Sequence, residues 1–314
     1  MRKFALILLT SMVCVLSMAQ SEEIVFTPQW TAQAQFAGYY AALEKGFYKE
    51  AGLKVTIKHP SPSNSSVNML KEGKANFITI YLVAALKSVA EGVPMIHMLQ
   101  TSQNNSQMII SHKPVKDVHD LRDMRIGRWK MGYMEFGQVV ENLYNLNIKW
   151  IPFVQNINLY ISGAIDATMG MSYNEYYQLM MAGQKIDKGH TLYLRNIGFD
   201  VPEDGLYVSA DYYEKHPKEA RKFAEASKRG WEWVAKHPEE ALDIVMKFTK
   251  ANHINTNRAA QRWMLNDILD VMKDPKSGQR TYQLKESSLQ KANRMLMQAK
   301  LIEKPITYQQ FTRP

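Results

Sequence analysis

The chain has 314 residues, which is enough for two domains of ordinary size, and 46% of them are hydrophobic, which is enough for packed cores. The formal charge of +9 comes from scattered lysines and arginines, and no basic run is longer than a pair such as Lys228–Arg229. This scattering, without a nucleic-acid-binding motif, argues against a nucleic-acid partner. The 8 histidines do not cluster at ligand spacing, so the sequence predicts no metal site.

The first residues have the pattern of an export leader. Arg2 and Lys3 precede an apolar run, 4–16, that is too short to cross a bilayer, and 17–19 reads small-x-small. We therefore expect a signal peptide over 1–19 and a mature chain that starts at Gln20. The one cysteine, Cys14, lies inside this leader, which excludes disulfides and a cysteine nucleophile from the mature chain.

The stretch 24–57 predicts a βαβ unit, around which the rest of the chain is organised. Residues 24–26 form a short apolar strand, and 29–33 form a polar loop with one large aromatic residue, Trp30. Apolar residues from Phe36 to Leu43 recur at helical spacing, and 53–57 alternate as a half-buried strand. In open α/β sheets ligands bind beyond the carboxyl ends of the strands, so the 29–33 loop is a candidate ligand site.

Strands and helices continue to alternate up to about residue 209, which predicts an α/β fold. Two apolar stretches, 107–111 and 205–209, are interpreted as the strands that cross between two domains. From Asp211 onward the pattern is helical, with helices expected over 218–235, 256–272 and 285–298.

Two segments resemble a known family. The run GYYAALEKGFYKEAGLKV at 38–55, preceded by Trp30, and KEGKANF at 71–77 are similar to periplasmic solute-binding proteins of ABC transporters, in the group that binds thiamine pyrimidine precursors and alkanesulfonates. The resemblance implies a two-lobed type II periplasmic binding protein with two crossing strands as a hinge and a helical C-terminal tail. The expected first lobe is 20–112 plus 205–314 with the C-terminal helices, and the expected second lobe is 113–204.

The resemblance also implies a function. We expect a monomeric periplasmic protein that delivers a small ligand, an aminopyrimidine such as a thiamine precursor, to an ABC transporter permease, with no cofactor. The alternatives are a binding protein for sulfonates or another small aromatic solute, and a sensor module that presents its ligand to a membrane receptor. A eukaryotic branch of the family synthesises the pyrimidine with a cysteine-rich motif, and the mature chain has no cysteine, so we do not expect an enzyme.

Two residues lead the candidate ligand site. Trp30 can stack on a flat ligand, although it can also anchor its own loop. Glu175 ends the run GMSYNE at 170–175, where the resemblance implies a carboxylate that accepts from amino and ring N–H groups; its alternative is a first-turn glutamate favoured by the helix dipole. Tyr39 can line the cleft or pack in the core, and Arg128 can pair with an anionic group. The remaining candidates are Gln29, Tyr81, Trp129 and Asn174.

Overall fold

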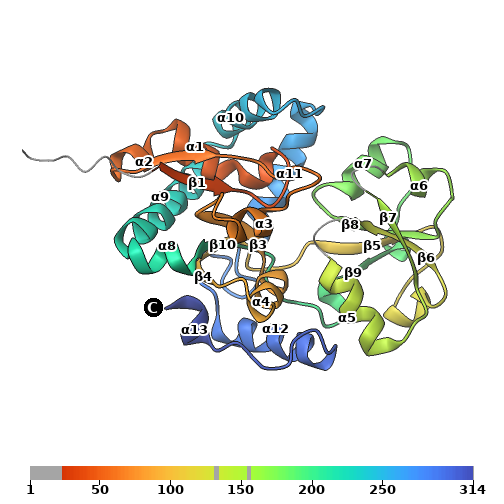
Figure 1. Cartoon of the computed structure of the whole chain (residues 1–314). Helices are drawn as coiled ribbons and strands as arrows, with labels where there is room; N and C mark the ends of the chain where they lie inside the picture. Colours follow the sequence, from red (N-terminus) through yellow and green to blue (C-terminus); the bar gives the residue numbers. More distant parts are fainter. Residues whose placement is uncertain (1–22, 131–133, 154–156, 314) are drawn as a thin grey trace, which may run out of the picture.

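The computed structural model describes residues 23–130, 134–153 and 157–313; the predicted leader over 1–19 lies outside them. Two five-stranded sheets form the centres of two lobes (Figure 1). Within the described ranges, no helix combines the length and the apolar character that a membrane span requires.

The first sheet has the order β2-β1-β3-β10-β4, in which β1 runs parallel to β2 and β3 while β10 runs antiparallel to β3 and β4. Because β10 returns from the second lobe, its first residue lies beside the carboxyl end of β3. The strands of this sheet are β1 (Glu23–Thr27), β2 (Lys54–Ile57), β3 (Phe77–Tyr81), β4 (Met95–Gln100) and β10 (Asp204–Ser209).

The second sheet has the order β7-β6-β8-β5-β9. Its strands are β5 (Gln107–Ser111), β6 (Arg125–Trp129), β7 (Lys149–Phe153), β8 (Ala167–Met171) and β9 (Thr191–Tyr193). The expectation that lobe 1 extends to residue 112 is wrong, because β5 pairs with β8 along its whole length and with β9 over residues 108–110. The chain crosses between the sheets at 101–106 and again at 194–203, and these two segments form the hinge.

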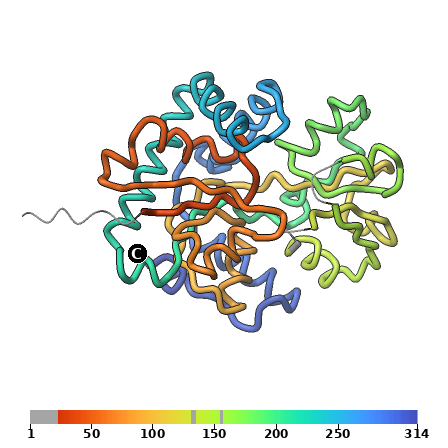
Figure 2. Tube along the Cα trace, turned by 45° about the horizontal axis from the view of Figure 1, so that its top comes forward, coloured from red at the N-terminus to blue at the C-terminus, as the bar shows by residue number. Residues whose placement is uncertain are grey.

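Helices cover both sheets, and the C-terminal ones pack mainly on the first lobe (Figures 1 and 2). The first lobe carries η1 (Ala34–Phe36), α1 (Ala37–Glu44), α2 (Phe47–Glu50), α3 (Ser66–Lys71), α4 (Leu82–Ala90), α8 (Ala210–Lys215), α9 (Pro217–Lys236), α10 (Pro238–Ala251), α11 (Arg258–Val271), α12 (Glu286–Gln298) and α13 (Tyr308–Thr312). The second carries η2 (Val118–Leu121), α5 (Met134–Tyr144), α6 (Asn158–Ile161), α7 (Glu175–Met181), η3 (Lys188–His190) and η4 (Leu194–Ile197).

Close packing of α1 on α9 fixes the chain that follows the ligand loop. A Cβ placed on Gly230 would lie 2.1 Å from the backbone oxygen of Gly38, so glycine at 230 is what allows the two backbones to approach. Trp231 is buried beside this contact and packs edge-on against Tyr39. Burial of these large side chains holds α1, and therefore the loop before it, rigidly on the first lobe.

Candidate ligand-binding cleft

A loop of glutamines follows β1 at the edge of the first sheet. Gln29, Gln33 and Gln35 are all buried. The backbone N–H of Gln29 donates to Thr79 Oγ1 on β3 at 3.1 Å, which ties the loop to the neighbouring strand. Amide groups therefore gather where parallel strands end, the edge at which α/β folds bind ligands.

Asp204, the first residue of β10, lies at the centre of these amides. Its Oδ1 accepts from Gln29 Nε2 at 2.6 Å and its Oδ2 from Gln35 Nε2 at 2.8 Å. Gln35 Oε1 in turn accepts from Gln33 Nε2 at 2.6 Å. Burial raises the pKa of Asp204 to about 6, although its two amide partners oppose the rise.

The backbone of Asp204 is tied to the first hinge segment. Its carbonyl oxygen accepts from Gln100 Nε2 at 2.8 Å, from the N–H and hydroxyl of Thr101 at 3.0 and 2.8 Å, and from the N–H of Ser102 at 3.1 Å. The preceding residue, Glu203, accepts from the N–H and hydroxyl of Ser106. Both acidic residues thus join the hinge to the ligand edge of lobe 1.

Trp30 lines two spaces between the lobes. A cavity of about 300 Å³ is lined by Gln29, Thr31, the loop that leads into α3, residues of α3 and α4, and Lys130 and Glu135 of lobe 2. A second space, a gap of only about 20 Å³, is lined by Gln33, Gln35, Tyr81 and the loop after β8. The larger space is at the lower end of the range for small-molecule sites, so it suits a small ligand.

The main chain of Trp30 is held by His59. Burial lowers the pKa of His59 to about 4, so its imidazole ring is neutral at neutral pH. Its Nδ1 lies 2.7 Å from the carbonyl oxygen of Trp30, which can only accept, so Nδ1 carries the proton. Nε2 is then the acceptor for the hydroxyl of Tyr40, 3.0 Å away. This chain of hydrogen bonds fixes the backbone from which the indole projects.

Glu175 opens α7 and is buried against lobe 2. Its Oε2 accepts from the N–H of Met171 at 3.0 Å, and its Oε1 accepts from Trp129 Nε1 at 3.1 Å and Asn174 Nδ2 at 3.0 Å. Burial raises its pKa, and these hydrogen bonds oppose the rise. Gly170 permits this arrangement, since a Cβ there would lie 2.9 Å from the Cβ of Glu175.

The two lobes meet at the small gap, which Tyr81 of the first lobe and Tyr173 of the second both line. The hydroxyl groups of Tyr81 and Tyr173 are 3.1 Å apart. Ser172 donates to Asp267 on α11 at 2.5 Å, and Trp263 Nε1 donates to the carbonyl oxygen of Ser172 at 3.0 Å. These contacts join α11 of the first lobe to the β8–α7 loop of the second, as in a closed two-lobed protein.

The structure brings most of the sequence candidates together. Trp30, Tyr81, Trp129, Asn174 and Glu175 line the small gap, and Gln29 and Trp30 line the larger cavity. Tyr39 lies elsewhere: it is 1% exposed, packs on Phe26 and Trp231, and lines neither space, so core packing describes it. Arg128 likewise lines neither space.

Sequence reasoning missed Asp204, Lys130 and Glu135. The sequence did carry a signal for Asp204. Glu203 and Asp204 stand directly before the apolar strand 205–209, and acidic residues are rarely buried. Its partners are 169 and 175 residues away, however, and no local pattern reveals them. Glu135 lies in the first turn of α5, and its Oε2 is buried and has no hydrogen-bond partner among the described residues.

Two α/β lobes, two hinge crossings and a ligand-sized cavity between the lobes define the class: the molecule has the fold of a periplasmic binding protein. A comparison with solved structures agrees on the fold. The periplasmic aliphatic sulphonate binding protein SsuA from Escherichia coli superposes with a TM-score of 0.57 over 93% of this chain and 92% of that one, at 12% identity.

The particular family follows from the sequence. The NMT1/THI5-like family model matches residues 33–241, and the chain belongs to that family. It is 21% identical to the formylaminopyrimidine-binding protein of Halalkalibacterium halodurans, over 83% of this chain and 82% of that protein. It is also 24% identical to the 4-amino-5-hydroxymethyl-2-methylpyrimidine phosphate synthase of Aspergillus parasiticus, over 71% of this chain and 70% of the synthase.

Proposed function

We propose that this chain is the periplasmic solute-binding component of an ABC import system and that its ligand is an aminopyrimidine related to thiamine precursors. It is exported by the 1–19 leader, acts as a monomer and hands the ligand to a permease. The formylaminopyrimidine-binding relative and the binding-protein fold support this function. Binding without catalysis accords with a mature chain that lacks cysteine.

One observation carries the choice of ligand. Gln29 lines the cavity beside Trp30, and its Oε1 is buried without a hydrogen-bond partner among the described residues. A buried acceptor without a donor costs about 1–3 kcal/mol. The atom is not accessible from the cavity in this structure, so a ligand N–H recovers that energy only after the Gln29 side chain rotates. An amino group on a flat ring that stacks on Trp30 supplies that donor.

The charges around the cavity also favour a neutral ligand with donors over an anion. Two lysines, Lys87 and Lys130, and two acidic residues, Glu91 and Glu135, line the cavity. Lys87 donates to Glu91 at 2.7 Å, so its charge is already paired. Glu135 brings a carboxyl group to the same wall as Lys130, so the cavity presents groups of both signs and no cluster of cations for a sulfonate.

Glu175 takes a different role from the one that the sequence suggested. Its two oxygens already accept three hydrogen bonds from the protein, so we propose that it positions Trp129 and Asn174 at the wall of the ligand space. Trp30 lines both spaces, so a ring that stacks on it in the larger cavity lies next to the small gap that Tyr81 and Trp129 line, and opening of the hinge admits it. Tyr39 supports α1 from the core and does not contact the ligand.

Calorimetry tests the proposal. Titration with 4-amino-5-hydroxymethyl-2-methylpyrimidine and with its formylamino relative should show submicromolar binding, which about ten heavy atoms can support at the best ligand efficiencies. Taurine and a longer alkanesulfonate serve as anionic controls and should give no heat. Tight sulfonate binding with no response to either pyrimidine would overturn the ligand assignment.

A further inference from the structure

Helix α11 contacts loops of both lobes that line the small gap. On the first lobe, the N–H of Ala34, in the glutamine loop 29–35, donates to Gln261 Oε1 at 2.7 Å. Gln261 is buried, and its Nε2 donates to Thr256 Oγ1 at 2.9 Å, so its amide has a fixed orientation. The glutamine loop is therefore held by α11 in addition to the first sheet.

The second lobe is held by α11 through Ser172, the first residue after β8. Trp263 Nε1 donates to the carbonyl oxygen of Ser172 at 3.0 Å, and the hydroxyl of Ser172 donates to Asp267 Oδ2 at 2.5 Å. Trp263 and Asp267 stand at positions i and i+4, so they lie on one face of the helix. The indole of Trp263 also packs on the ring of Tyr177 in α7, with the ring centroids 5.2 Å apart.

Ser172 leads directly into the wall of the small gap, because residues 173–175 all line it. The glutamine loop contributes Gln33 and Gln35 to the same gap. Since the gap measures only about 20 Å³, the position of Ser172 on α11 determines how closely the two loops approach each other. The helix therefore acts on the space between the lobes through the loops that it holds.

Ser172 also lies against the hinge. Its N–H donates to the carbonyl oxygen of Ser106 at 3.1 Å, and α11 is tied to the same crossing segment by the N–H of Gln103, which donates to the carbonyl oxygen of Val271 at 2.8 Å. Hydrogen bonds weaken steeply when their distance or angle departs from the ideal. A rotation of the second lobe about the hinge therefore breaks the bonds between α11 and Ser172 and separates α11 from α7.

We propose that Trp263 and Asp267 are positioning residues that form a closure latch: they hold Ser172, and with it the ligand wall, against α11, and so set how long a bound ligand stays. The inference rests on the proposed function and deepens it, since it names the contacts that keep the cleft closed. Neither residue lines the cavity or the gap, so both act on the ligand through the hinge angle. A contact made only in the closed form shifts the equilibrium toward that form.

Rates of ligand exchange test the latch. Trp263→Phe removes the indole N–H and keeps an aromatic ring on Tyr177, and Asp267→Asn replaces a charged acceptor by a neutral one. Dissociation of 4-amino-5-hydroxymethyl-2-methylpyrimidine, followed by stopped-flow fluorescence, should be roughly three- to tenfold faster in each variant. Association should stay within about twofold of wild type, because the latch forms after the ligand has entered.

Two matched controls make the same chemical changes away from Ser172. Trp233→Phe alters a tryptophan of α9, and Asp270→Asn alters an exposed aspartate of α11 that follows Asp267 along the helix. Both controls should exchange the ligand at wild-type rates. Ser172→Ala removes the donor to Asp267 and should act like Asp267→Asn, so it tests the inference if Asp267→Asn does not fold.

The closed fraction gives a readout that a merely structural role would not move. The mature chain has no cysteine, so cysteines introduced at Asn255 and Lys185, which are exposed on the first and second lobes, can carry a pair of spin labels. Distance distributions with and without the pyrimidine give the populations of open and closed protein. Trp263→Phe and Asp267→Asn should shift the population toward the open form, whereas a role in stability alone would lower Tm without this shift.

The outcomes separate the two proposals. If folded Trp263→Phe, Asp267→Asn and Ser172→Ala exchange the ligand and close as wild type does, the latch is overturned and the proposed function is unaffected. If wild-type protein binds no pyrimidine, the proposed ligand is contradicted and the ligand-free distances decide: a closed population that falls in the variants supports the latch, and an absent or unchanged one overturns it. Faster dissociation and a smaller closed fraction in the variants, with both controls at wild-type values, would support the inference.

Discussion

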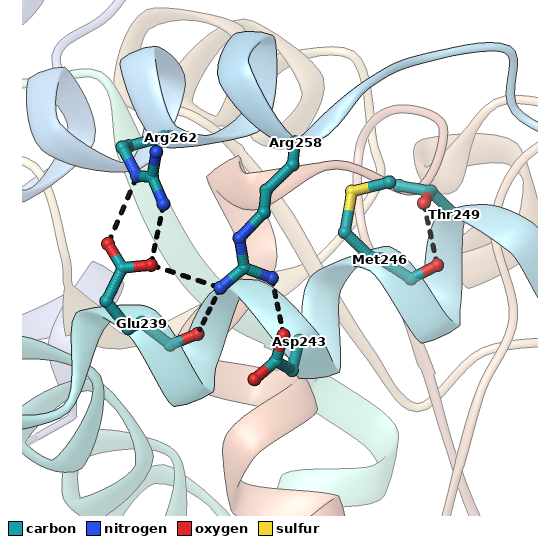
Figure 3. A network of polar contacts seen from close by, with 6 residues as sticks. All are labelled: Glu239, Asp243, Met246, Thr249, Arg258 and Arg262. Carbon is teal, nitrogen blue, oxygen red and sulfur yellow. Dashed lines mark hydrogen bonds and ion pairs between the residues drawn. The ribbon is translucent and has the colours of Figure 1, made fainter.

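Two clusters of charged side chains in this protein use similar groups in opposite surroundings. On the surface, Arg258 and Arg262 of α11 meet Glu239 and Asp243 of α10 (Figure 3). In the interior, the donors that Asp204 and Glu203 meet at the hinge among the described residues are neutral. The exposed acidic residue Glu239 has a lowered pKa because of its arginine partners, whereas the buried residues have raised pKa values because of desolvation.

The difference shows what each cluster contributes. Solvent and salt weaken the exposed ion pairs. These pairs therefore make a small contribution to the packing of α10 on α11 and have little effect elsewhere. A buried carboxylate without a cation destabilises the folded chain, yet it orients every donor around it. A polar group that reduces stability at the hinge is therefore a stronger indication of function than a larger group of ion pairs on the surface.

The largest effect is expected for Glu203→Gln. The pKa of Glu203 is raised to about 8 from an ordinary value of 4.5, chiefly by burial, so the folded state binds an extra proton between these values. Binding of this proton by Glu203 stabilises the folded state fully below pH 4.5, and the stabilisation is lost as the pH rises through 8. At about 1.4 kcal/mol per unit, the loss is on the order of 3–5 kcal/mol.

Urea unfolding of wild type and Glu203→Gln at pH 5 and at pH 9 measures this loss. The glutamine side chain of the variant can keep the contacts, with its oxygen accepting from backbone N–H groups and its NH₂ group donating to the hydroxyl of Ser106. The variant should match wild type at pH 5 and exceed it at pH 9. Equal pH dependence in the two proteins would show that Glu203 is not the titrating group.

Trp30→Ala should have the next largest effect, on ligand affinity. The indole lines both spaces between the lobes, and its removal should weaken aminopyrimidine binding by about 1–3 kcal/mol. Thermal unfolding of the ligand-free protein is the control, because the backbone of Trp30 stays held by His59. A loss of stability as large as the loss of affinity would indicate that Trp30 serves mainly to anchor its loop.

Glu175→Gln should weaken aminopyrimidine binding at least tenfold, or about 1.4 kcal/mol. The new NH₂ group must face either Met171 N–H or the donors of Trp129 and Asn174, so the wall of the cleft loses its fixed position. Calorimetry measures the affinity, and indole fluorescence reports whether Trp129 has moved. Wild-type affinity in the variant would show that Glu175 does not support the ligand site.

Arg262→Ala should have the smallest effect. Arg262 donates twice to the exposed Glu239, at 2.7 and 3.1 Å (Figure 3). We expect a small fall in Tm at low salt that disappears in high salt, because the pair is screened. Ligand affinity should not change. A fall in Tm that persists in high salt would show that the Arg262–Glu239 pair is not screened, as an exposed ion pair should be.

Much of the fold could be predicted from sequence, because local patterns carry it. The alternation of strands and helices, the helical tail and the ligand loop with Trp30 all follow from periodicity and turn residues. The border of lobe 1 was misplaced because an apolar strand such as 107–111 reads the same in either sheet, and only its pairing with β8 and β9 assigns it.

The candidate site was predicted less completely, for a related reason. Trp30 and Glu175 follow strand ends, and the resemblance to the binding-protein family supported a ligand role for both. Asp204 matters because β10 returns antiparallel to β3, with Asp204 opposite Tyr81, and no local pattern predicts that register. Tyr39 has the helical spacing of a core residue, and burial against Trp231 places it in the core.

Native mass spectrometry of the protein purified from the cell envelope tests the central claim most directly. The account predicts that the protein carries a small ligand whose mass is that of an aminopyrimidine, and that the ligand is released when Trp30 is replaced by alanine. A bound sulfonate, or any ligand without an N–H donor, would contradict the account.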